Sequence, residues 1–242
     1  MNAEQIYPLG ELLEATFIQR DNRFRAEVAL NGVPVKVHVP NSGRMRELLV
    51  PGVSVWIQPA SGENRKTAYT LLLVQQGERF VCLNAHLAND IAGLWLKQNM
   101  LPGFTDVTAV EREKTYGKSR FDFRLQRHGK TCYAEVKSVN LLDGHTARFP
   151  DAPTERGSKH LLELVQCKKD GLDAAVIFLV MGNQAVDFDV NRETDPAFDE
   201  NLKLAVQAGV EVYVYTCEID LQGIRYTGTI PLQGEAAWKS MH

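Results

Sequence analysis

Two neighbouring segments, 119–127 and 131–139, alternate apolar and polar side chains in the way that β-strands do. Asp122 stands between two phenylalanines in the first segment, and Glu135 and Lys137 are two residues apart in the second. Strand side chains alternate between faces, so Glu135 and Lys137 point the same way and Asp122 lies on the polar face of its own strand. If the two strands pair with each other, two carboxylates and one ammonium group converge.

That convergence suits a hard divalent cation beside a reactive water. Asp122 and Glu135 would each give an oxygen to Mg²⁺ or Mn²⁺, and the Val136 carbonyl a third. Lys137 would orient the water or stabilise charge that develops on a phosphate. Glu113, on the preceding strand, is a further candidate ligand. An exposed sheet face with a Glu–Lys pair gives the same spacing, and E-x-K triplets are common, so the spacing alone does not decide.

A proline-containing loop precedes a predicted helix over residues 155–169, and Thr154 is placed to cap that helix. Arg156, His160 and Glu163 share one polar face at helical spacing, which could face the carboxylates and bind phosphate. A solvated helix face explains this spacing equally well. The candidate phosphate-binding residues of this half are Arg120, Arg156, Lys159 and His160.

Residues 13–80 contain about five short strands separated by turns, with a strong hairpin signal at Asn31-Gly32. This pattern predicts a small closed or partly open β-barrel. Arginines cluster around Phe24 and after the Pro40–Gly43 turn, as suits binding to a single strand or a duplex backbone. We expect Phe24 itself in the core. The candidate nucleic-acid-binding residues are Arg20, Arg23, Arg25 and Arg44.

From about residue 84 the pattern changes to helices and strands in the order α-β-β-β-α-β-α-β. Such an order requires a mixed sheet covered by helices. We therefore predict two domains, 1–82 and 83–242. The last 20 residues are poorly patterned, and we expect them to be loosely ordered.

The whole chain of 242 residues has a net charge of −3, which gives no global signal for nucleic acid. Residues 111–170, however, hold 13 Lys and Arg against 9 Asp and Glu, whereas residues 171–242 hold 4 against 11. This locally basic strip around the candidate carboxylates would attract phosphates, although a solvated surface of mixed charge is an alternative.

Four cysteines without a CxxC pair predict buried free thiols in a reducing cytoplasm. We expect no signal peptide and no membrane span.

The residues resemble the SfsA (sugar fermentation stimulation protein) family. The resemblance runs from about residue 15 to 217 and is carried by several strings. These are F-I-x-R-x-x-x-F from Phe17, H-V-P-N-S-G from His38, E-x-x-Y-G from Glu113, S-R-F-D-F from Ser119, E-V-K-S-V from Glu135, and F-P-D-A-x-T-E-R-G-x-K-H-L-x-E-L from Phe149.

The resemblance implies an OB-fold barrel followed by a mixed α/β domain of the PD-(D/E)xK nuclease type. It implies DNA binding with low sequence specificity and a regulatory role in sugar (maltose) metabolism. It also places Asp122 and Glu135 as metal ligands and Lys137 as the catalytic lysine. That nuclease superfamily often adds a helical Glu before the first core strand. Here the first helix offers Asn84, Asn89 and Asp90 instead.

Three functions are therefore distinguished. The first is a Mg²⁺-dependent endonuclease. The second is a DNA-binding regulatory protein that does not cut and keeps the nuclease fold only for binding. The third, action on a sugar or sugar phosphate, ranks lowest, because no paired acid/base carboxylates at glycosidase-like positions and no Gly-rich phosphate loop are evident. A homodimer is left open.

Overall fold

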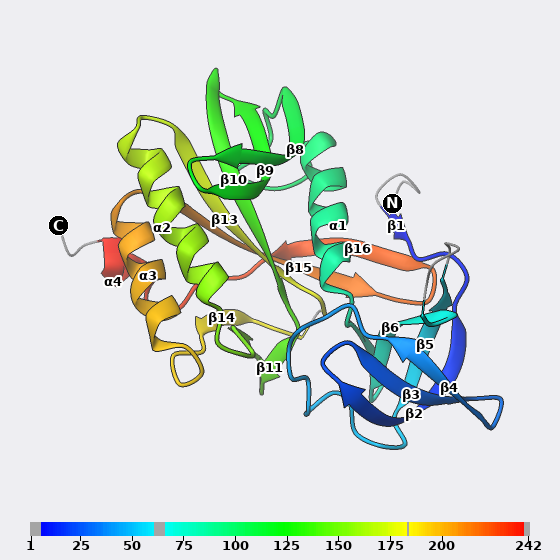
Figure 1. Cartoon of the computed structure of the whole chain (residues 1–242). Coiled ribbons are helices and arrows are strands. Elements are labelled where there is room, and N and C mark those ends of the chain that lie inside the picture. Colours follow the sequence, from blue (N-terminus) through cyan, green and yellow to red (C-terminus); the bar gives the residue numbers. More distant parts are fainter. Residues whose placement is uncertain (1–5, 61–65, 183, 240–242) are drawn as a thin grey trace. The chain divides into compact units, whose positions relative to one another are not determined.

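The computed structural model describes residues 6–60, 66–182 and 184–239 (Figure 1). Its internal contacts divide the chain into two units. The first contains the described residues of Met1–Leu87, Met181–Asn183 and Cys217–Thr227, and the second those of Ala88–Val180, Gln184–Thr216 and Gly228–His242. The predicted single boundary between residues 82 and 83 stays a prediction.

The first unit is built on a β-barrel. Its strands are β2 (Leu13–Asn22), β3 (Arg25–Leu30), β4 (Val33–His38), β5 (Ser54–Pro59) and β6 (Tyr69–Gln76), and β7 (Arg79–Cys82) continues from β6. The sheet order is β4-β3-β2-β5-β6-β7, and β4 also pairs in parallel with β6 at Val37↔Tyr69 and His38↔Thr70. This extra pairing closes five strands into a barrel, as predicted. Beside the barrel, β1 (Ile6–Pro8) pairs antiparallel with β16 (Gly223–Thr229).

The β3–β4 hairpin turns at Asn31 and Gly32, whose φ angles are +51° and +79°. A two-residue hairpin turn with positive φ at both positions favours Asn-Gly, so the hairpin prediction is confirmed. Ala26 and Val28 alternate inward on β3 and are fully buried with Val37 in the barrel core.

The expectation that Phe24 belongs to this core is wrong, because its side chain is 50% exposed. Strand β3 begins only at Arg25, so strand alternation does not extend to residue 24. Phe24 lies in the β2–β3 turn, where its N–H donates to Asn22 Oδ1 at 3.0 Å and its carbonyl accepts from the Val39 N–H at 2.9 Å. These turn hydrogen bonds, and not the strand pleat, set the direction of its side chain.

The second unit contains a mixed sheet in the order β15-β13-β10-β9-β8. Its strands are β8 (Ala109–Tyr116), β9 (Ser119–Arg127), β10 (Lys130–Val139), β13 (Asp173–Val180) and β15 (Glu211–Ile219). β9 runs antiparallel to both of its neighbours, β8 and β10, while β10, β13 and β15 are parallel. β13 is buried along almost its whole length, as the central strand of a parallel arrangement must be.

The helices are α1 (Ala85–Lys97), α2 (Glu155–Lys169), α3 (Pro196–Gln207) and α4 (Glu235–Lys239), and α2 and α3 lie side by side in Figure 1. Leu161 and Leu164 of α2 pack with Phe178 of β13 in one buried core. The Thr154 side chain accepts the Gly157 N–H at 3.1 Å, which confirms the predicted helix cap. The predicted order of helices and strands is confirmed. The prediction did not include a small second sheet that the structure contains, made of β11 (Leu141–Asp143), β12 (Thr146–Phe149) and β14 (Asp187–Val190).

The expectation of a loosely ordered C-terminus is wrong for the described residues 223–239. They contain the whole of β16 and the helix α4, whose Trp238 is buried in the core of the second unit. A single buried indole in a short helix leaves no periodic signal in the sequence.

All four cysteines are buried and free, as predicted. No helix in the described part of the chain has the length and apolarity needed to cross a bilayer.

Candidate metal centre and basic pocket

The pairing of β9 with β10 brings the predicted acidic residues together. The two strands are antiparallel with Ala134 opposite Phe123, so the next step of the register places Glu135 opposite Asp122. Asp122 Oδ2 accepts the Val136 N–H at 2.8 Å, which joins the two strands beyond their regular ladder. We refer to Asp122, Glu135 and Lys137 as the carboxylate centre.

Glu135 is buried, and its two carboxylate oxygens differ. Oε1 accepts a hydrogen bond from Lys137 Nζ at 2.8 Å and another from His160 Nδ1 of α2. Oε2 is also buried but has no hydrogen-bond partner among the described residues. Burial raises the pKa of Glu135, but the nearby Lys137 and His160 outweigh burial, so the net pKa is lowered. Glu135 is therefore held as a carboxylate with one oxygen left over.

Asp122 is held by α1 as well as by β10. Asn89 Nδ2 donates to Asp122 Oδ1 at 2.7 Å. Burial, and then the charge of Glu135, raise the pKa of Asp122 to about 6. Two adjacent carboxylates, one partly and one fully buried, repel each other, and a cation between them would relieve that repulsion.

Glu113 lies close enough for its charge to contribute to the raised pKa of Asp122. It lies across from Asp122, because Arg112 pairs with Phe123 and Lys114 with Phe121 in an unshifted register, and its backbone is left-handed, with φ +55°. Its carboxylate forms an ion pair with Arg120 at 2.7 Å. The described residues contain no group of three or more His, Cys, Asp or Glu side chains placed to hold a metal ion. As a third ligand, Glu113 stays a prediction.

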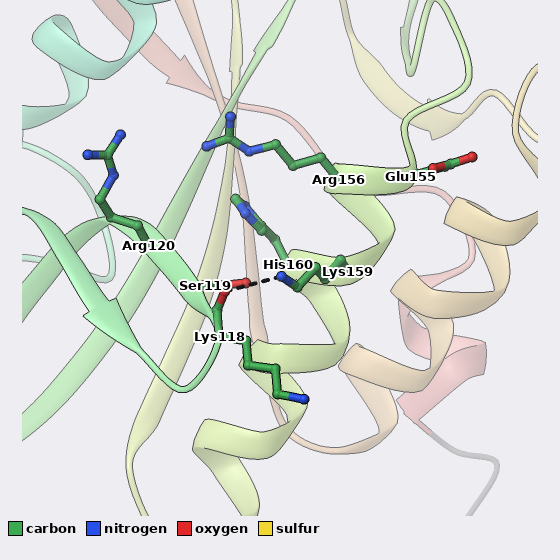
Figure 2. A pocket seen from close by; sticks show the side chains of 7 residues that line it. All are labelled: Lys118, Ser119, Arg120, Glu155, Arg156, Lys159 and His160. Carbon is green, nitrogen blue, oxygen red and sulfur yellow. Dashed lines mark hydrogen bonds between the residues drawn. The ribbon is translucent and has the colours of Figure 1, made fainter.

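A cavity of about 540 Å³ lies between the β8–β9 turn and the start of α2 (Figure 2). Its lining, which we call the basic pocket, consists of Lys118, Ser119, Arg120, Glu155, Arg156, Lys159 and His160. The structure thus gathers all four predicted phosphate-binding residues of this half into one cavity. His160 differs from the others because it is buried and bonded to Glu135. Sequence reasoning missed Lys118, although the adjacent Gly117 already marked a hairpin turn there.

The barrel arginines do not form a comparable cluster of free cations. We call Arg20, Arg23, Arg25 and Arg44 the arginine turn. The Arg20 guanidinium donates to five backbone carbonyls at 2.6–3.3 Å, those of Asn22, Arg23, Asn41, Gly43 and Arg44. Arg25 forms an ion pair with Asp21 at 3.0 Å. Arg20 therefore holds two loops together. Phosphate binding by the arginine turn stays a prediction.

Comparisons with known proteins agree with both halves of this architecture. Residues 18–83 match the SfsA N-terminal OB domain, and residues 86–223 match the family described as sugar fermentation stimulation protein RE domain. The expected OB-type barrel followed by a mixed α/β domain is confirmed.

Individual relatives extend the match to almost the full chain. A sugar fermentation stimulation protein homolog of Desulforamulus reducens is 42% identical over 96% of this chain and 96% of its own length. The homolog of Clostridium kluyveri is 43% identical over 86% of this chain and 91% of its own length. A solved structure, described as Pyrococcus furiosus SfsA in complex with Ca²⁺, has a TM-score of 0.89 at 27% identity and covers 95% of this chain and 99% of its own. The chain belongs to the SfsA, or sugar fermentation stimulation protein, family.

Proposed function

We propose that this protein binds DNA and hydrolyses its phosphodiester bonds with the help of a divalent cation at the carboxylate centre. One observation carries the proposal. Asp122 is partly buried and Glu135 is buried beside it, neighbouring groups fix the orientation of both carboxylates, and Glu135 Oε2 has no partner in the described structure. A buried carboxylate oxygen without a partner is costly, and a bound cation would satisfy it.

The residues present fit Mg²⁺ or Mn²⁺. Asp122 and Glu135 supply hard oxygen donors, and Mg²⁺ typically takes one or two protein carboxylates and keeps several waters. The P. furiosus relative is described in complex with Ca²⁺, another cation that prefers oxygen ligands. When bound, such a cation makes a coordinated water more acidic and neutralises charge on a phosphate.

The protein's own side chains then have distinct tasks. His160 and Lys137 hold Glu135 ionised, and Asn89 fixes the orientation of Asp122. Lys137, whose side chain is 12% exposed, would donate to the attacking water or to a phosphate oxygen. In the reaction the water oxygen bonds to phosphorus, the bond from phosphorus to one sugar oxygen breaks, and a proton passes to that leaving oxygen. Cationic side chains of the basic pocket would bind a phosphate group of the DNA.

A second candidate is a DNA-binding protein that does not cut. It is favoured by two observations: α1 presents Asn89, and no glutamate, to Asp122, and one oxygen of Glu135 is already engaged by two cationic or polar groups. Under either candidate, we propose that the link to sugar (maltose) metabolism operates through DNA binding, by regulating transcription.

The deciding experiment incubates pure protein with labelled single- and double-stranded DNA in Mg²⁺, in Mn²⁺ and in chelator. We expect metal-dependent nicking that Lys137→Ala loses and that Lys130→Ala retains. Lys130 is a matched control because it is an exposed lysine at the start of the same strand, β10. Binding without cleavage in every metal condition would reject hydrolysis and leave the second candidate. DNA affinity should also fall steeply with salt, since backbone contacts release counterions.

A further inference from the structure

The basic pocket contains more positive charge than contact with one internal phosphate of DNA requires. Among the described residues, Lys118, Arg156 and Lys159 form no ion pair with a carboxylate, whereas Arg120 is paired with Glu113. Glu155 is the one acidic residue of the lining, and Figure 2 shows its carboxylate directed away from these cations. Three cations of the lining thus have no ion-pair partner among the described residues.

We propose that the basic pocket binds the phosphate monoester at the end of a nucleic-acid strand. This inference rests on the proposed function, because it names the part of the nucleic acid that the site selects. An internal phosphodiester carries one negative charge and two non-bridging oxygens. A terminal phosphate carries about −1.5 to −2 at neutral pH and has three strong acceptor oxygens. Three cations without a carboxylate partner match the terminal group better in both charge and number of acceptors.

The pocket also contains donors that are fixed before any ligand binds. Lys159 Nζ is held by the Lys118 carbonyl at 3.1 Å, as the dashed line in Figure 2 marks. The Lys118 N–H donates to Glu163 on α2 at 3.2 Å, which ties the β8–β9 turn to that helix. Ser119 is only 3% exposed, and its Oγ has no hydrogen-bond partner within the described residues. A buried hydroxyl without a partner in a cationic cavity is suited to donate to an anion.

The size of the cavity supports the same ligand. A volume of about 540 Å³ lies within the range of about 300–1,000 Å³ that is usual for small-ligand sites. It exceeds the needs of a phosphate group alone and would admit part of the terminal sugar. Contacts along a continuous backbone would instead be expected to follow a groove, with cations spread along it.

The pocket and the carboxylate centre share a residue. His160 lines the cavity and bonds to Glu135 through Nδ1. A nucleic-acid strand whose terminal phosphate is bound in the pocket would therefore place its last few nucleotides at the carboxylate centre. If the centre cuts DNA, its first products should come from within a few nucleotides of a phosphorylated end.

The test measures equilibrium binding by fluorescence anisotropy in chelator, so that no cleavage occurs. The probes are one short single-stranded oligonucleotide with a 5′-phosphate, with a 3′-phosphate or with hydroxyls at both ends. We expect one phosphorylated form to bind about 10-fold more tightly than the hydroxyl form, the ratio that corresponds to ~1.4 kcal/mol. Arg156→Ala and Lys159→Ala should abolish this preference. Lys169→Ala should keep it, because Lys169 is an exposed lysine at the far end of the same helix.

The outcomes separate the inference from the function on which it rests. Equal binding of all three oligonucleotides would overturn end recognition and leave DNA binding intact. A preference that survives both Arg156→Ala and Lys159→Ala would overturn the assignment to this pocket. Binding of none of the three, whether as single strands or after annealing to a complementary strand, would reject the proposed DNA binding itself. Both substituted side chains are exposed, and thermal unfolding of each variant establishes that it is folded.

Discussion

The carboxylate centre and the arginine turn show two different fates of charged residues that cluster in sequence. At the carboxylate centre, Asp122 and Glu135 lie on paired strands. Their neighbours do not use all of the acceptor oxygens, since Glu135 Oε2 has no hydrogen-bond partner among the described residues. At the arginine turn, the Arg20 guanidinium donates hydrogen bonds to five backbone carbonyls, and Arg25 forms an ion pair with Asp21. Strand alternation fixes the direction of a side chain. In turns, loop carbonyls without a backbone partner accept hydrogen bonds from a cationic side chain and so set its direction.

The largest effect that would test this comparison is on the stability of the barrel. We expect Arg20→Ala to lower the free energy of unfolding by about 3–4 kcal/mol, since hydrogen bonds to a charged group contribute about 1.5–3 kcal/mol each and loop carbonyls partly regain water. Urea denaturation measures it. Arg23→Ala is the matched control and should cost less than ~0.5 kcal/mol, as is usual for surface substitutions. If both variants unfold at the same urea concentration, Arg20 does not hold the loops.

A second prediction concerns the electrostatic cost of the carboxylate centre without metal. The pKa of Asp122 is raised from 3.8 to about 6, so its ionisation destabilises the fold by up to ~3 kcal/mol at pH 7. This penalty is fully present above pH 6, declines as pH falls, and is absent below pH 3.8. Asp122→Asn should therefore stabilise the metal-free protein at pH 7 and lose this advantage near pH 4.

Denaturation of wild type and Asp122→Asn in chelator at both pH values measures the difference. The comparison with Asp122→Asn cancels the opposite contribution of Glu135, whose pKa is lowered and whose stabilisation is lost as pH falls below 4.5. A variant that is less stable than wild type at pH 7 would contradict the idea that the two carboxylates repel each other.

The third prediction tests whether the free oxygen of Glu135 takes part in metal binding. Saturating Mn²⁺ should stabilise wild type by about 2.7 kcal/mol when the ion is present at 100 times its dissociation constant. Glu135→Gln should lose nearly all of this gain. Its control, Glu111→Gln, removes a carboxylate that pairs with Lys114 and Arg124 on the surface and should keep it. Equal thermal shifts in the two variants would place the metal elsewhere.

The smallest effect concerns the exposed aromatic ring of the barrel. Phe24 lines a cavity of about 470 Å³ together with Asn22, Arg25, His38, Lys66 and Thr67. If a base stacks on this ring, Phe24→Ala should weaken binding of single-stranded DNA by about 1–2 kcal/mol, since base–aromatic stacking contributes about 1–3 kcal/mol.

The stability of the barrel should change little in this variant, because the ring is half exposed. Val33→Ala, another exposed apolar side chain of the barrel, is the matched control and should leave the affinity unchanged. Unchanged affinity in Phe24→Ala would remove the barrel ring from the DNA interface.

The elements with strong periodicity were predictable from sequence, and the weakly patterned ones were not. The helix after Thr154 and the buried strand before Met181 follow from caps and apolar runs of ordinary length. Strand β14 has only four residues and gains its hydrogen bonds from β12, about forty residues earlier in the chain. Helix α4 is a single turn anchored by Trp238. Neither has enough residues to show a period.

Sequence by itself determined which side chains share a face: Glu135 and Lys137 on one strand, and Arg156 and His160 on one helix. Period and chirality are local properties of the backbone, so they can be read from neighbouring residues. Only the tertiary structure decided that His160 and Asn89 hold Glu135 and Asp122, that Arg20 binds carbonyls, and that Phe24 is exposed. These outcomes depend on which distant groups need a hydrogen-bond partner once the chain has packed, and no local pattern records that need.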